Sequence, residues 1–276
     1  MEHRRRTIFN WYKKGKINLI FIPRRKPLNL VLFLSLFDKR DLRYITEKFS
    51  FIMRVSSIFR VNDLIWIDDV KNKDINKIIC ELYKYSILPS YLKKDFPIKN
   101  ELKYAGLLSP VNLPSHPQQA LPLEGEVRIG RKGNFGIDVD TPYNDGYSMV
   151  IDSIKRRAIS YPDFTLYSGA AQKIIDEEGF CSAISSFTIV GTRSGNNPLE
   201  RYFEIKNNYE KFGITLIIGP PKGGIIRKIS SCNGNEEKEQ YNKIEFYNFI
   251  PKQGVRDVRA EEALLSSLSI INMIIN

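Results

Sequence analysis

The stretch that decides the fold of this chain is residues 249–272, which read FIPKQGVRDVRAEEALLSSLSIIN. It begins at the end of an apolar segment, passes through a turn that contains Pro251 and Gly254, and ends in a run rich in leucine and isoleucine. Pro and Gly mark turns, and residues 263–275 include too many apolar side chains for a freely solvated helix. We therefore predict a buried strand, a loop that can hold a ligand and a packed C-terminal helix.

The spacing within this stretch closely resembles the signature P-x-Q-G-x-R-x-x-R-x-E-E-A of SPOUT-superfamily RNA methyltransferases, in particular their archaeal and eukaryotic branch. The matching positions are Pro251, Gln253, Gly254, Arg256, Arg259, Glu261, Glu262 and Ala263. Similarity recurs upstream in RVSSIFRVNDLIWIDD at 54–69, ELKYAGLLSPVNLPSHP at 101–117, VGTRSG at 190–195 and IIGPPKGG at 217–224. The resemblance covers the chain from about residue 28 onward.

The resemblance implies an α/β fold of the SPOUT trefoil-knot methyltransferase type, with a small inserted β-barrel that is OB-like. On this pattern residues 28–105 and 166–276 form a split SPOUT methyltransferase domain, and residues 106–165 form the inserted OB-like RNA-binding domain. Residues 1–27 are then a basic N-terminal extension. The family usually works as a homodimer through the C-terminal helix, which here has apolar residues on more than one side.

Composition restricts the partners and the metals. The chain has 42 Lys and Arg against 31 Asp and Glu, a net charge of +11, which attracts polyanions or acidic membrane surfaces without separating them. The apolar runs are too short to span a membrane and the basic start lacks a signal-peptide core, so we expect a cytoplasmic protein without a membrane partner. Cys80, Cys181 and Cys232 form no C-x-x-C pair, and the only histidines are His3 and His116. We expect free buried thiols and no metal.

The periodicity of apolar residues predicts strands alternating with helices. The predicted strands of this alternation are residues 28–36, 64–67, 187–190, 214–218 and 244–250. The predicted helices are residues 41–59, 73–85, 170–178 and 263–275. Such alternation is typical of a mainly parallel sheet.

A proline-rich connection at residues 110–122 leads into a predicted β insertion. Short strands are predicted at 125–130, 135–140 and 147–154, with a turn at 131–134 joining the first two. OB folds often bind nucleic acid through a strand face and loops. The predicted RNA-contacting residues are Arg128, Arg131, Lys132, Lys155, Arg156 and Arg157. The alternative interpretation, that such residues are ordinary solvated positions, also applies to the basic residues within 1–27.

Three predicted strand ends carry glycine-containing loops, at residues 191–195, 219–224 and 251–254. Glycine lets a flat ligand approach the backbone, and parallel sheets bind ligands beyond the carboxyl ends of their strands. No phosphate-binding or dinucleotide-binding glycine motif occurs, which disfavours ATP and NAD. The resemblance implies S-adenosylmethionine as the cofactor. Its predicted binding residues are Thr192, Gly219, Pro220, Gly223, Ile250, Gln253, Gly254 and Val255; core packing is the alternative for Ile250 and Val255.

Arg256 and Arg193 are the predicted catalytic residues, and Arg259 is a predicted RNA contact. Guanidinium groups suit phosphate oxygens and can orient a base. Alternatively, Arg256 and Arg259 form ordinary ion pairs with neighbouring carboxylates at the helix end. Methyl transfer from a sulfonium is an in-line displacement, so the site must position the acceptor, and a protonated ring nitrogen also needs a base or electrostatic stabilisation.

The sequence thus predicts an S-adenosylmethionine-dependent RNA methyltransferase, and the resemblance favours N3 of a uridine in ribosomal RNA. A ribose 2′-hydroxyl or a purine acceptor stays open, as does a non-catalytic RNA-binding or ribosome-assembly factor with the SPOUT fold. Two departures from the family pattern motivate this last alternative. Lys252 stands where relatives often have Gly, and Pro221 stiffens the second loop.

Overall fold

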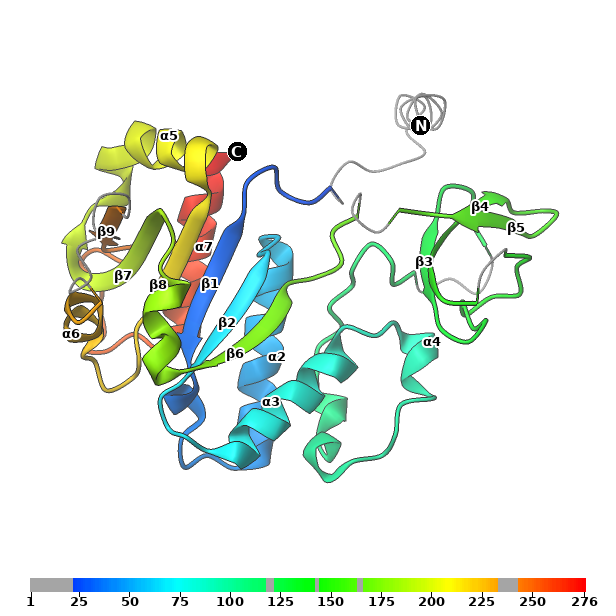
Figure 1. The fold of residues 1–276 in the computed structure, drawn as a ribbon, viewed down its shortest axis with the longest axis horizontal. Helices are drawn as coiled ribbons and strands as arrows, with labels where there is room; N and C mark the ends of the chain where they lie inside the picture. Colours follow the sequence, from blue (N-terminus) through cyan, green and yellow to red (C-terminus); the bar gives the residue numbers. More distant parts are fainter. Residues whose placement is uncertain (1–21, 118–121, 142–143, 163–165, 233–242) are drawn as a thin grey trace. The chain divides into compact units, whose positions relative to one another are not determined.

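The computed structural model describes residues 22–117, 122–141, 144–162, 166–232 and 243–276 (Figure 1). These residues form two compact units. The sheet unit consists of Arg24–Tyr83, Asn100–Ser109 and the described part of Gly169–Asn276. The small β unit consists of the described residues of Lys84–Lys99 and Pro110–Ser168, together with residues 22 and 23.

The sheet unit is built on a six-stranded sheet with the order β6-β2-β1-β8-β7-β9. Its strands are β1 (Leu28–Phe33), β2 (Asp63–Asp68), β6 (Ala171–Asp176), β7 (Phe187–Asn196), β8 (Ile214–Ile218) and β9 (Lys243–Tyr247). All of the pairings between these described strands are parallel. The prediction of a mainly parallel sheet is therefore confirmed.

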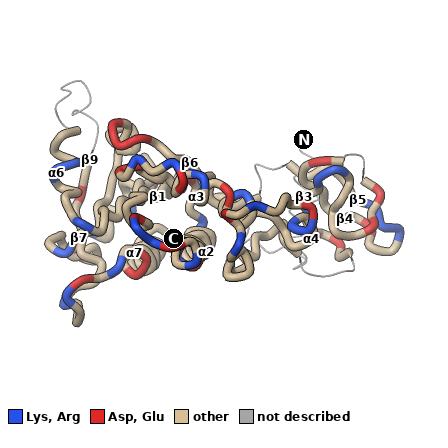
Figure 2. Tube along the Cα trace, turned by 90° about the horizontal axis from the view of Figure 1, so that it is seen from below, with Lys and Arg blue, Asp and Glu red and all other residues tan. Residues whose placement is uncertain are grey.

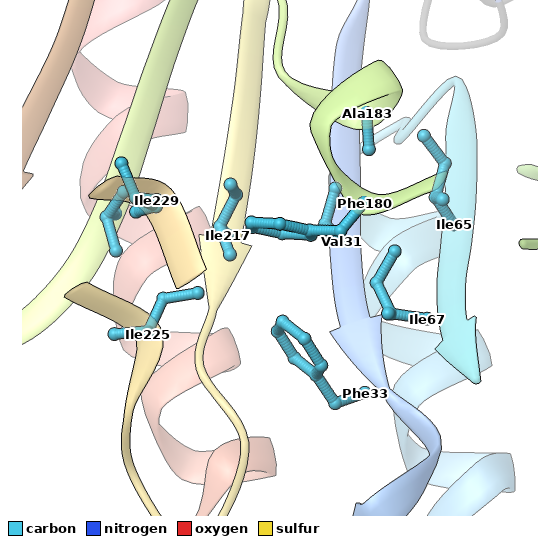
Figure 3. Close-up of a cluster of buried hydrophobic side chains, with 10 residues drawn as sticks. Val31, Phe33, Ile65, Ile67, Phe180, Ala183, Ile217, Ile225 and Ile229 are labelled. Carbon is cyan, nitrogen blue, oxygen red and sulfur yellow. The ribbon is translucent and has the colours of Figure 1, made fainter. Parts of the chain in front are cut away.

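Helices cover both faces of this sheet (Figures 1 and 3). The helices of the sheet unit are α2 (Leu42–Ile58), most of α3 (Lys73–Ser86), α5 (Tyr202–Phe212), α6 (Ile225–Ser230) and α7 (Ala260–Ile275). The Asp41 side chain caps α2 by accepting a hydrogen bond from the Tyr44 N–H at 2.8 Å. α7 contacts both α2 and α5, so the predicted C-terminal helix exists and is packed.

The opposite face carries α6 and the 3-10 helix η6 (Glu177–Ala183). Phe180 and Ala183 of η6 and Ile225 and Ile229 of α6 are buried against Val31, Phe33, Ile65, Ile67, Val190 and Ile217 of the sheet (Figure 3). These two short helices are therefore held mainly by burial of apolar surface.

The predicted helix at 170–178 is wrong, because residues 171–176 form strand β6. β6 pairs in parallel with β2 from Ala171 opposite Asp63 to Asp176 opposite Asp68. Ala, Gln and Lys at its start favour a helix, but the exposed edge of β2 offers a complete ladder of hydrogen bonds. Tertiary pairing overrides the weaker local preference here.

The small β unit contains a three-stranded antiparallel sheet with the order β3-β4-β5, together with the short helix α4 (Ser90–Lys93). The strands are β3 (Val127–Gly130), β4 (Gly146–Asp152) and β5 (Arg157–Ser160). Residues 135–140 were predicted as a strand, and this prediction is wrong. Gly136 has a φ of 74°, and a Cβ there would lie 2.4 Å from the Tyr91 ring, so the chain turns where a strand would continue.

The prediction of free thiols is wrong for two cysteines. Cys181 of η6 and Cys232, two residues beyond α6, form a disulfide with a Cα–Cα distance of 5.4 Å. Their separation of 51 residues in sequence concealed a pairing that the packing of η6 against α6 creates. Cys80 is the one cysteine among the described residues that forms no disulfide.

The described end of the basic N-terminal segment is part of the sheet unit. Arg24 is only 9% exposed and donates to the Phe59 carbonyl at 2.8 Å and to the side chain of Asn272. It therefore joins the ends of α2 and α7. The basic residues at positions 4–6, 13 and 14 lie outside the described residues. Within the part of the chain that the structure describes, no helix is long and apolar enough to cross a membrane.

Candidate functional site

A cavity of about 1120 Å³ lies in the sheet unit, where β1, β7, β8 and β9 end. β1 and β8 are neighbours, but the chain continues from β1 to β2 on one side and from β8 to β9 on the other. Such a switch point at the carboxyl ends of parallel strands is the usual ligand site of an open α/β sheet. Ligand pockets are commonly about 300–1,000 Å³, so this cavity has room for a cofactor and part of a second molecule.

Most of the predicted cofactor and catalytic residues meet in this cavity, together with the predicted RNA contact Arg259. Those that line it are Thr192, Arg193, Gly219, Pro220, Ile250, Gln253, Arg256 and Arg259. Gly223, Gly254 and Val255 lie in the same loops but not in the lining. The predicted convergence of the three glycine-containing loops is therefore confirmed.

The first loop is a bulge in β7. Gly191 and Asn196 both pair with Tyr247 of β9, so residues 192–195 project from the sheet. Asn248 holds the bulge by donating from its backbone to the Asn196 carbonyl at 2.8 Å and from its amide to the Arg193 carbonyl at 2.9 Å. Gly195 is required for the fit, because a Cβ there would lie 2.6 Å from the Tyr247 backbone.

The second loop connects β8 to α6. A Cβ on Gly219 would lie 3.1 Å from the Cβ of Ile225, so glycine allows this close approach. Gly223 and Gly224 have φ values of 76° and 89°, in the left-handed region that favours glycine. Gly223 and Gly224 thus shape the turn into α6, besides allowing a ligand to approach.

The third loop is braced from within and from the first loop. The Gln253 amide donates to the carbonyls of Val255 at 2.9 Å and Arg256 at 3.0 Å. The Arg193 guanidinium donates to the same Arg256 carbonyl at 3.4 Å, which joins the two predicted catalytic residues. Val255 is 58% exposed, so core packing does not explain that residue.

Ion pairs with neighbouring carboxylates explain the presence of Arg256 and Arg259 only in part. Arg256 approaches Asp257 at 3.9 Å, but both side chains are almost fully exposed, and such pairs contribute little. Glu262 accepts from the Arg259 N–H at 2.9 Å, and Glu261 pairs with Lys48 at 3.2 Å. The guanidinium groups of Arg256 and Arg259 therefore remain available to a ligand in the cavity.

The electrostatic character of the cavity is strongly positive. Its cationic lining residues are Lys39, Arg40, Lys48, Arg193, Lys222, Arg227, Arg256 and Arg259, and its anionic ones are Asp38 and Asp257. Clefts lined by one sign of charge concentrate ligands of the opposite sign. The cavity therefore suits an anionic molecule such as RNA.

Two hydroxyl groups in the lining are poised for a ligand. The Oγ of Ser35 and the Oγ1 of Thr192 are shielded from solvent and have no hydrogen-bond partner among the described residues. Buried polar atoms are normally paired, so a ligand or a water in the cavity can supply a partner for each hydroxyl. These features fit S-adenosylmethionine, which presents amine, carboxylate, ribose and adenine groups to such partners.

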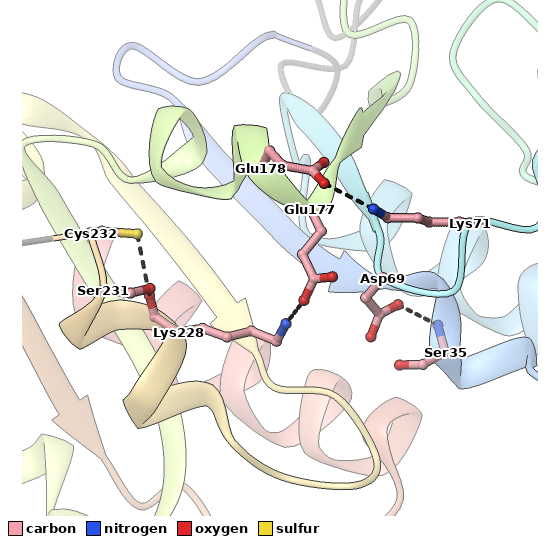
Figure 4. Close-up of polar contacts among 8 residues, drawn as sticks. All are labelled: Ser35, Asp69, Lys71, Glu177, Glu178, Lys228, Ser231 and Cys232. Carbon is pink, nitrogen blue, oxygen red and sulfur yellow. Dashed lines mark hydrogen bonds and ion pairs between the residues drawn. The ribbon is translucent and has the colours of Figure 1, made fainter.

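One wall of the cavity is formed by residues that no sequence motif singled out. This wall comes from the 3-10 helix η2 (Leu34–Phe37), the turn that follows it and the start of α2, with the residues Ser35, Lys39, Arg40, Tyr44 and Lys48. Their place in the sequence could have revealed them. They follow β1, and β1 ends at the switch point of the sheet. The Ser35 N–H donates to the Asp69 carboxylate at 2.8 Å and ties this wall to the end of β2 (Figure 4).

The predicted RNA-contacting residues of the small β unit do not behave alike. Arg131, Lys132, Lys155, Arg156 and Arg157 are exposed. Arg128 is only 2% exposed, pairs with Glu126 and donates to the Phe135 carbonyl at 3.2 Å, so its role is structural and its predicted RNA contact is not supported. Figure 2 shows Lys and Arg in both units rather than in one segment.

The chain is similar in sequence to proteins described as RNA methyltransferases. Residues 34–131 match a family described as "Putative RNA methyltransferase". The chain is also 25% identical over 277 residues to a 28S rRNA (uridine-N(3))-methyltransferase of Drosophila melanogaster, an alignment that covers 79% of this chain and 56% of the fly protein. These matches indicate an RNA methyltransferase of the SPOUT type.

Two archaeal relatives match most of this chain. Uncharacterized proteins of Haloarcula marismortui and Halobacterium salinarum are each 22% identical over 273 and 274 residues, covering 86% of this chain and 95% of theirs. The chain spans just over half the length of the fly relative. The chain therefore matches nearly the full length of the archaeal proteins and only part of the fly protein.

Proposed function

We propose that the chain transfers a methyl group from S-adenosylmethionine to N3 of a uridine in ribosomal RNA. The observation that carries this proposal is the positively charged cavity where the three glycine-containing loops meet, with two unpaired hydroxyl groups in its lining. The uridine N3 activity of the fly relative supports the choice of acceptor. A ribose 2′-hydroxyl or a purine nitrogen is the alternative acceptor.

Some residues of the cavity would bind the cofactor, and others would act on the acceptor base. Thr192, Gly219, Pro220, Ile250 and Gln253 would hold the cofactor, with Gly223, Gly254 and Val255 shaping the loops beside it. When bound, S-adenosylmethionine supplies a methyl group on a sulfonium centre. The protein's part is then to position the acceptor and exclude water.

Uridine carries a proton on N3 at neutral pH, so the site must favour its loss. The guanidinium groups of Arg193 and Arg256 would stabilise the negative charge that develops on the base, as preorganised donors do. Asp38 and Asp257 are the carboxylates in the lining and are the candidates to accept the proton. Arg259 would bind an RNA phosphate at the start of α7.

The proposal includes the tertiary features that the resemblance implies. The C-terminal chain would thread a trefoil knot, and the small β unit would be an OB-like RNA-binding domain with Arg131, Lys132, Lys155, Arg156 and Arg157 as contacts. Leu265 and Met273 of α7 are 39% and 78% exposed, and we assign them to a homodimer interface in a cytoplasmic protein. The proposal assigns no metal to the site.

The first test is calorimetric titration with S-adenosylmethionine and S-adenosylhomocysteine, comparing the wild type with Thr192→Val. Valine keeps the shape but removes the unpaired hydroxyl, so cofactor affinity should fall by about 3- to 10-fold while the stability of the free protein does not fall. Thr188→Val is the matched control in the same strand. Its Oγ1 bonds to the Ser185 backbone at 3.1 Å, so this variant should lose stability and keep cofactor affinity.

The second test is methyl transfer to ribosomal RNA, followed by mass spectrometry of the released nucleosides. Methylated uridine of the N3 type is the expected product. Methylation at another atom would show that the acceptor is not N3 of uridine. If the wild type bound no cofactor, the proposal that the chain is an enzyme would be refuted. RNA binding without cofactor would then support a non-catalytic assembly factor.

A further inference from the structure

Tyr44 is the most accessible aromatic ring in the cavity lining. The lining contains two aromatic residues, Tyr44 and Phe249. Phe249 is only 7% exposed and packs against the ring of Tyr247 with centroids 6.3 Å apart. Tyr44 is half-buried on the first turn of α2, so its ring is the one in this lining that a planar ligand can reach.

Two cations flank the Tyr44 ring. The guanidinium carbon of Arg40 lies 4.8 Å from the ring centroid, and the Nζ of Lys48 lies 4.7 Å from it. Lys48 is fixed in this position, because its side chain is 9% exposed and pairs with Glu261 at 3.2 Å. Arg40 is exposed. Of these two neighbours, Arg40 can move when a ligand arrives.

Stacking of a nucleobase on an aromatic ring is stronger than an exposed contact between a cation and the same ring. A base that replaces Arg40 over Tyr44 would also place a phosphate near the displaced guanidinium. Lys39, beside Arg40 in the lining, adds a second cation for that phosphate. The wall thus offers an anion site and a stacking surface within one nucleotide's reach.

We propose that Tyr44, Arg40 and Lys39 bind one nucleotide of the RNA, its base stacked on the Tyr44 ring and its phosphate on the two cations. The proposal rests on the proposed function only in taking RNA as the ligand of this cavity. It assigns substrate binding to the start of α2, apart from the arginines of the third loop. Tyr44 acts here in binding, with no role in moving the methyl group.

The test measures binding of a short fluorescein-labelled oligouridylate by fluorescence anisotropy, with an abasic strand of equal length as the second probe. Tyr44→Leu, which keeps an apolar side chain in the helix, should weaken binding of the oligouridylate about 10-fold and leave the abasic strand unchanged. Tyr44→Phe keeps the ring and should bind both probes like the wild type. Thermal melting of each variant establishes that it is folded.

The phosphate contact is tested by Arg40→Ala. This variant should weaken both probes and reduce the slope of log affinity against log salt by about 0.7. Arg43→Ala is the matched control, since Arg43 lies beside Tyr44 but pairs with Glu47 and is not part of the lining. It should change binding less than about 2-fold, because an exposed charge outside the cavity contributes little.

Wild-type affinity in Tyr44→Leu would overturn the stacking role, and so would an equal loss on the abasic strand. Equal effects of Arg40→Ala and Arg43→Ala would overturn the phosphate role. Neither measurement requires methyl transfer or cofactor. The binding inference can therefore fail while calorimetry still establishes the cofactor site, and it can hold if the chain proves to be a non-catalytic RNA-binding factor.

Discussion

Reduction of the Cys181–Cys232 disulfide should destabilise the sheet unit substantially. The bridge links residues 51 apart in sequence, and closing a loop of that length removes unfolded-state entropy equivalent to about 4 kcal/mol at 25 °C. Glu177 and Lys228 form an ion pair across the same two helices (Figure 4). This pair is partly exposed and cannot replace the covalent link.

The assay is urea unfolding followed by circular dichroism, with and without a dithiol reductant, on the wild type and on Cys232→Ser. The free energy of unfolding should fall by about 4 kcal/mol on reduction and by a similar amount in the oxidised variant. Ile225, Ile226 and Arg227 of α6 line the cavity, so reduction should also weaken cofactor binding.

The control is Cys80→Ser, which removes a cysteine outside the disulfide and should keep the full response to reductant. An unfolding midpoint that is the same in oxidised and reduced wild-type protein would refute the reasoning. It would mean that the two sulfurs are not bridged in solution, or that the core cluster of Phe180, Ala183, Ile225 and Ile229 already restricts the unfolded chain.

Three further predictions concern the free energy of unfolding. Lys252 has a φ of 55°, so Lys252→Gly should raise the free energy of unfolding by about 0.5–1 kcal/mol, measured by urea titration. Glu261→Gln breaks the largely buried pair with Lys48 and should cost about 3 kcal/mol, whereas Glu178→Gln at the exposed pair with Lys71 should cause no measurable change. Burial lowers the pKa of His116 to about 4. The free energy of unfolding should therefore fall by up to about 3 kcal/mol as the pH falls from 6.5 to 4. His116→Gln should remove this part of the pH dependence.

The direction of the His116 effect follows from its hydrogen bond, and the control for Lys252 follows from the backbone angles. His116 donates from Nε2 to the Ile87 carbonyl at 3.0 Å and is neutral when folded, so the unfolded chain binds the extra proton and acid favours unfolding. An unchanged pH profile in His116→Gln would contradict this assignment. Lys222→Gly, at a residue without positive φ, should destabilise the protein, and equal effects at Lys222 and Lys252 would argue against backbone strain.

The sequence by itself determined the parallel α/β class, the positions of the main strands and the three loops of the site. Those features depend on local patterns: runs of apolar residues for β1, β2 and β8, and glycines where the backbone must turn or approach closely, as at Gly195 and Gly224. Local patterns are visible in sequence because neighbouring residues produce them.

Tertiary structure alone decided what depends on partners distant in the chain. Residues 171–176 became a strand because β2 offered an edge, Arg128 became buried beside the ring of Tyr91, and the disulfide formed because η6 and α6 pack on one cluster. The wall at Arg40 and Tyr44 reached the cavity for the same reason, since the sheet order places the end of β1 beside the end of β8. Contacts of this kind are set by the packing of whole elements, which no short stretch of sequence encodes.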